Sequence, residues 1–71
     1  MSDLRATLQA SLFLAEATAA IERARVTRSE AALDRAAKLL NSEKNEALPD
    51  DEQRHLALLY AEAAHACYGG F

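Results

Sequence analysis

The side chains that could carry chemistry gather in the last third of the chain. His55, Glu62, His65 and Cys67 fall in one stretch without glycine or proline, which predicts that they share a helix. Zinc would need imidazole, thiolate or carboxylate ligands that converge on one point. His65 and Cys67 are two positions apart, so they point about 160° apart around a helix and form neither a metal pair nor a nucleophile–base pair. We therefore expect no metal site and no catalytic residue.

Other signatures of catalysis or of a membrane protein are missing from the sequence. The only glycines, Gly69 and Gly70, are near the end of the chain and build no phosphate-binding loop. We expect no enzyme activity, no cofactor and no small-molecule substrate. No apolar run approaches the roughly 18–20 residues of a membrane span, and the polar start does not resemble a secretory signal. A single Cys67 builds no internal disulfide, which favours a reducing, cytoplasmic location.

Basic residues cluster in the middle of a chain whose formal net charge is −3. The candidate basic patch consists of Arg23, Arg25, Arg28, Arg35 and Lys38. Residues 42–71 are acidic, with two basic against six acidic side chains. Nucleic-acid binders normally carry a basic excess, so we expect a solvated surface here. A nucleic-acid-associated regulator that uses this patch is an alternative hypothesis.

The composition predicts an all-α fold in a single domain, residues 1–71. Alanine (17 residues) and leucine (11) dominate the 71 residues, and both favour helices, whereas strand-forming residues are scarce. Glycine and proline do not occur before Pro49. The acidic, proline-containing segment 41–50 is the one clear linker.

The spacing of apolar residues predicts a small three-helix bundle or helical hairpin, with helices at about 3–26, 28–43 and 51–68. A break near 27–29 brings the apolar faces of the first two helices into phase, and Thr27 with Glu30 has the form of a capping box. A single helix over 3–43 is the alternative. Asp50 with Gln53 predicts a second capping box, and Gly69 predicts a helix stop.

The first helix carries apolar residues on two opposite sides, which is typical of a helix between two neighbours. One strip is Leu4, Leu8, Leu12, Ala15, Ala19 and Val26, and the other is Ala6, Ala10, Phe13, Ala17, Ala20, Ile21 and Ala24. The last helix also has a wide apolar arc, centred on Leu56, Leu59, Tyr60, Ala63, Ala66 and Cys67. A chain of this length buries so many apolar sides with difficulty, so we expect oligomerisation or another protein to complete it. The expected protein-binding residues are Phe13, Ile21, Leu58, Tyr60, Tyr68 and Phe71.

A Pro-Asp turn at Pro49 precedes a last helix rich in Ala, Leu and Tyr. This layout resembles small type III secretion co-chaperones and half of a tetratricopeptide-type array, which implies helical packing and protein binding. No specific motif of either family is present, so the resemblance transfers no residue.

The function we expect is a small protein-binding helical protein: an adaptor, a co-chaperone or an inhibitor of a partner protein. Its size and Ala/Arg bias are typical of bacterial or phage proteins. Besides the nucleic-acid hypothesis, the alternative is a homodimer with a structural or regulatory role and no other partner, since symmetric dimers are the commonest oligomers.

Overall fold

The computed structural model describes residues 2–69, with side chains at residue 5 and residues 7–69. It contains four α-helices: α1 (Ser2–Thr27), α2 (Glu30–Leu40), α3 (Glu43–Glu46) and α4 (Asp50–Cys67). No strand occurs in this range, so the all-α prediction is confirmed. The molecule is elongated, with extents of 46 × 18 × 16 Å, because α1 alone is about 39 Å long.

The predicted break between the first two helices is present, and the single long helix is excluded. Arg28 adopts a left-handed conformation with φ of 55°, which turns the chain back on itself. Ser29 caps α2, and its Oγ accepts a hydrogen bond from the Ala32 N–H at 3.3 Å. The predicted capping box at Thr27 is wrong, because Thr27 is still part of α1 and its Oγ1 donates to the Arg23 carbonyl at 2.7 Å.

The expected linker is more ordered than its polar composition indicated. α2 ends at Leu40 rather than near 43, and the single-turn helix α3 occupies part of the segment 41–50. The second predicted capping box is also wrong, because the N-cap of α4 is Pro49, which has no side-chain acceptor. The Gln53 Nε2 instead donates to the Leu48 carbonyl at 2.8 Å and so ties α4 to the connection before it. Gly69 has a φ of 81°, which confirms the predicted glycine stop.

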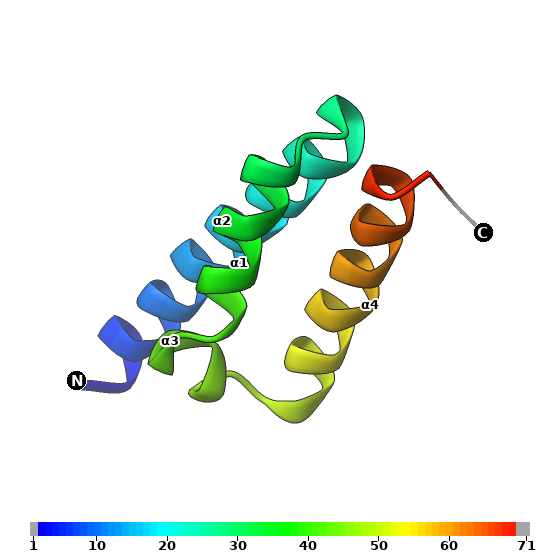
Figure 1. Ribbon diagram of the computed structural model, residues 1–71. Helices are drawn as coiled ribbons and strands as arrows, with labels where there is room; N and C mark the ends of the chain where they lie inside the picture. The colour runs from blue at the N-terminus through cyan, green and yellow to red at the C-terminus, as the bar shows by residue number, and fades with distance from the viewer. Residues whose placement is uncertain (1, 70–71) are drawn as a thin grey trace.

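The core lies between α1, α2 and α4. α2 and α4 each pack along α1 and also contact one another (Figure 1). The buried residues are Phe13, Ala17, Ile21, Ala24, Leu33, Ala36, Leu48, Leu56 and Ala63. Alanines make up much of this set, and their small side chains allow helix backbones to approach closely, while Phe13, Ile21 and Leu56 supply the bulk.

Candidate interaction surfaces

One apolar strip of α1 is buried and the other is exposed. We call the exposed strip the outer face of α1, and it consists of Leu8, Leu12, Ala15, Ala19 and Val26. Its three larger side chains are 59–75 % exposed. At 100° per residue, the centre of this strip lies about 180° from the buried strip around Ala17. α2 and α4 both pack on the buried side, so nothing in the chain described here covers the outer face of α1.

The first turns of α1 extend past the core. Arg5, Thr7, Leu8 and Gln9 are all exposed, and among the side chains that the structure describes Phe13 is the first buried one along the helix. Helical turns without tertiary contacts are marginally stable in water. The described side chains at the start of α1 are therefore less buried than those of its second half.

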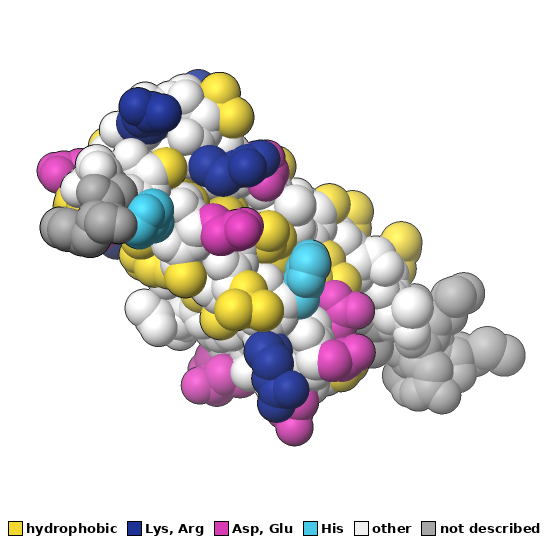
Figure 2. All heavy atoms as spheres, turned by 90° about the vertical axis from the view of Figure 1, so that its right-hand side faces the viewer, with side chains coloured by type: hydrophobic (Ala, Val, Ile, Leu, Met, Phe, Trp, Pro, Cys, Tyr) yellow, Lys and Arg dark blue, Asp and Glu magenta, His cyan; other side chains and the backbone are white. Residues whose placement is uncertain are grey.

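A second exposed surface is the outer face of α4, formed by Arg54, Ala57, Leu58, Ala61 and Tyr68. Leu58 and Tyr68 are 63 % and 56 % exposed. Figure 2 looks at this side of the molecule, where apolar side chains alternate with arginine, histidine and acidic ones. The outer face of α4 is thus a mixed surface, whereas the outer face of α1 is continuously apolar from Leu8 to Ala19 along its centre.

The six residues expected to bind a partner differ in how exposed they are in the structure. Phe13 and Ile21 are only 3 % and 1 % exposed, so they are core residues and not contact residues in this fold. Their strip faces α2 and α4, and both side chains contribute bulk to the core between the three helices. Tyr60 is half-buried against the core, whereas Leu58 and Tyr68 are exposed. Phe71 lies outside the described residues.

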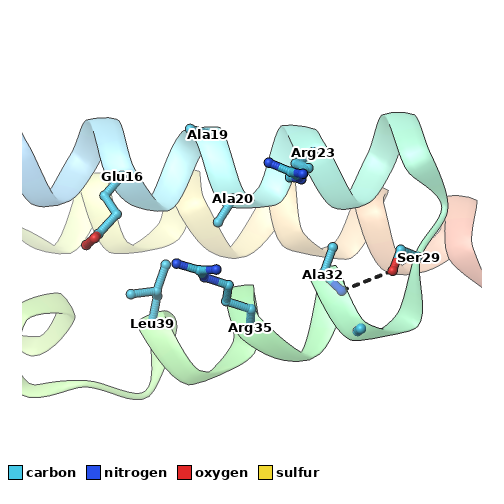
Figure 3. Close-up of a pocket in the computed structure, with 9 residues that line it drawn as sticks. Glu16, Ala19, Ala20, Arg23, Ser29, Ala32, Arg35 and Leu39 are labelled. Atoms are coloured by element: carbon cyan, nitrogen blue, oxygen red, sulfur yellow. Dashed lines mark hydrogen bonds between the residues drawn. The ribbon is translucent and has the colours of Figure 1, made fainter.

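The five basic residues of the predicted patch are all exposed. Arg23 of α1 and Arg35 of α2 line the same groove of about 570 Å³, and Figure 3 shows them on opposite walls. Four alanines and Leu39 also line the groove, and so does Glu16. Two guanidinium groups placed in this way could attract a carboxylate or a phosphate, although the neighbouring Glu16 opposes that.

Arg25 belongs to a different surface from Arg23, because two positions on a helix point about 160° apart. Its guanidinium donates a hydrogen bond to Glu22 Oε2 at 2.6 Å. This hydrogen bond and the negative charge of Glu22 raise the pKa of Arg25 above its ordinary value. Glu22 therefore neutralises one member of the predicted basic patch.

A second groove of about 600 Å³ runs between α1 and the α3 connection. Its lining residues are Gln9, Ala10, Leu12, Phe13, Glu16, Lys44, Ala47 and Leu48. Most of these residues are apolar, and Glu16 and Lys44 supply opposite charges. Leu12 belongs both to this groove and to the outer face of α1, so the two surfaces are continuous.

The candidate chemistry residues of α4 point in different directions. Cys67 is half-buried, with its Sγ 3.4 Å from the Ala24 carbonyl and 3.7 Å from the Ser29 carbonyl, whereas His65 is exposed. The thiol thus packs the end of α4 against the α1–α2 turn. Within residues 2–69, no group of three or more His, Cys, Asp or Glu side chains is arranged to hold a metal ion. No helix in that range has the length and apolar character needed to cross a membrane.

Sequence reasoning did not select Leu8, Leu12 and Val26, although it placed them on an apolar strip. The signal that could have found them is their spacing. Steps of four and three residues alternate through Leu8, Leu12, Ala15 and Ala19, and this spacing is typical of a helix that pairs with another helix.

No protein-family model, no curated protein and no solved structure matches this chain.

Proposed function

We propose that this protein is a small helical protein-binding module of the adaptor, co-chaperone or inhibitor type. The observation that carries the proposal is the exposure of large apolar side chains on two separate helices. The buried core does not include Leu8, Leu12 and Val26 of α1, and it does not include Leu58 and Tyr68 at α4. Extended apolar surface on a small domain marks a site of protein interaction, because leaving it in water costs free energy.

The outer face of α4 is the surface we assign to a different protein. Interfaces that form and dissociate are about as polar as the rest of a protein surface, and they are enriched in tyrosine and arginine. Tyr68, Leu58 and Arg54 provide this combination on one side of α4. The largest share of the binding energy is expected from Leu58 and Tyr68, since a few apolar or aromatic side chains usually dominate an interface.

Affinity capture from the native cell tests this proposal. The full chain serves as bait in three forms: wild type, Leu58→Arg, and Asn41→Arg as a control that adds the same charge at an exposed position away from both outer faces. We expect wild type and the control to retain the same protein, and Leu58→Arg to reduce its recovery at least about tenfold. Purified partner should then raise the melting temperature of the wild type, because it binds only the folded chain.

The proposal fails if no protein is retained in a manner that depends on Leu58. Equal recovery by the wild type and Leu58→Arg would show that the captured material does not contact the outer face of α4. Far-UV circular dichroism of each bait checks that its helix content is unchanged, so that loss of binding is not loss of folding.

A further inference from the structure

We propose that the outer face of α1 binds a second copy of this chain, with the two α1 helices antiparallel about a two-fold axis. This inference is independent of the partner assigned to α4. A symmetric interface must be self-complementary, because the same patch supplies both sides. We can therefore compare the residues of one outer face with the residues that they would face on a second copy, pair by pair.

The alternating steps of four and three residues on the outer face allow the two α1 helices to pair in antiparallel. In the alignment we propose, each residue faces the partner residue whose number, added to its own, gives 27. Leu8 then faces the partner's Ala19, and Leu12 faces the partner's Ala15. Each leucine meets an alanine, so large and small side chains interdigitate and the two backbones approach closely. The two-fold axis repeats these contacts, which gives four apolar layers in all.

Charged residues lie at both ends of this row of apolar layers, and in the same alignment each of them faces the opposite charge. Arg5 faces the partner's Glu22, and symmetry gives a second such pair at the other end. Glu22 accepts from Arg25 through Oε2 within its own chain, and a carboxylate has a second oxygen for another donor. The flanking positions add no repulsion, because Gln9 lies beside the partner's Glu16.

Other alignments of the same strip are worse matched. A shift of seven residues one way places Leu12 against the partner's Glu22 and brings Glu16 beside the partner's Glu16. A shift the other way places Arg5 against the partner's Ala15 and leaves Glu22 without a facing cation. A parallel pair sets Glu22 beside the partner's Glu22. Like charges across an interface and charges set against apolar groups both oppose binding, so the charge pattern selects the first alignment.

The proposed contact also accounts for the start of α1. Arg5, Leu8 and Gln9 extend past the core of their own chain and are exposed. In the dimer these turns lie along the second half of the partner's α1, where Ala19 and Glu22 are placed. α2 and α4 pack on the opposite, buried strip of each α1, which leaves its outer face open to a second copy. The interface involves one helix from each chain and is small, so we expect micromolar affinity.

Sedimentation equilibrium with charge-exchange variants tests the proposal. Between about 5 and 500 µM, the wild-type mass should rise from one chain to two. Arg5→Glu and Glu22→Arg should each raise the dissociation constant at least about tenfold, because each places like charges together twice. The double variant should dimerise again, and so should an equimolar mixture of the two single variants. Leu58→Arg is the control and should dimerise like the wild type.

A wild type that stays monomeric at the highest concentration overturns the proposal. Failure of both the double variant and the mixture to dimerise overturns the antiparallel alignment. Leu12→Arg is a second check that does not depend on charge pairing: it must abolish the dimer with unchanged helicity, and a dimer that survives it contradicts the assignment. The result of this experiment does not depend on the capture of a partner through α4. A monomeric chain could still capture a partner, and a dimeric chain could fail to do so.

Discussion

The two faces of α1 differ little in composition but greatly in environment. Both are apolar and combine alanines with larger side chains, which are Phe13 and Ile21 on the buried face and Leu8, Leu12 and Val26 on the outer face. Ile21 on one face is almost fully buried by α2 and α4, whereas Leu12 on the other is 63 % exposed. The difference shows that apolar patterning alone does not determine which face of a helix packs within its own chain.

This contrast also distinguishes the residues that stabilise the fold of one chain from those proposed to bind a second chain. The buried face of α1 contributes free energy within one chain, because its side chains leave water when the bundle folds. The outer face contributes only when a second molecule covers it. Substitutions on the two faces should therefore affect different measurements.

The largest expected effect comes from the buried face. Ile21→Ala removes bulk from the centre of the core and should lower the free energy of unfolding by about 2–5 kcal/mol. Urea denaturation of wild type and variant at equal low concentration measures the loss. A loss below about 1 kcal/mol would show that the two faces of α1 are not energetically distinct.

A smaller effect is expected at the start of α2, which must fold back onto the buried face. Ser29→Ala removes the side-chain oxygen that accepts from the Ala32 N–H, and should cost about 1 kcal/mol. Ser29→Thr, which keeps a hydroxyl acceptor, is the matched control. If both variants melt at the wild-type temperature, the cap does not hold α2 against α1.

The turn before Ser29 should allow a gain in stability. Arg28 has a φ of 55°, a conformation that costs most residues about 1–2 kcal/mol and glycine little. Because glycine also loses more chain entropy on folding, we expect Arg28→Gly to raise the free energy of unfolding by about 0.5–1 kcal/mol. Arg28→Ala keeps the strain and should show no such gain in thermal unfolding; equal gains in both variants would refute the role of the backbone angle.

The smallest expected effect comes from the outer face. Leu12→Gln should change the free energy of unfolding by less than about 0.5 kcal/mol at concentrations where the chain is monomeric. The same variant should weaken dimerisation measurably. A large loss of stability in the monomer would mean that Leu12 packs within its own chain, contrary to its exposure.

Periodicity was sufficient to predict the helix break, but the local caps needed the structure. The phase of the apolar residues placed the break near 27–29, and Arg28 makes the turn there. The caps were assigned incorrectly because α1 continues through Thr27 and because Pro49 starts α4 one residue earlier than expected. α3 is four polar and charged residues long and has no apolar pattern that could have revealed it.

The surface residues were harder to predict than the helices. Phe13 and Ile21 have the character of partner contacts, but the bundle needs their bulk in its core. Leu58 and Tyr68 are exposed, and their contact with a partner stays a prediction, while the equally exposed Leu8 and Leu12 are not among the residues that the sequence singled out. Hydrophobicity alone does not predict which of two apolar strips is buried, because the outcome depends on which helices pack beside each one.

Hydrogen exchange at the start of α1 tests most directly whether a second copy covers its outer face. Backbone amides of residues 7–12 should exchange faster in dilute protein, where the outer face of α1 is in water, and markedly more slowly at high concentration, where the partner's α1 covers it. The amides around Leu56 serve as the internal reference and should be well protected at both concentrations. Fast exchange of residues 7–12 that does not change with concentration would contradict self-association through this face.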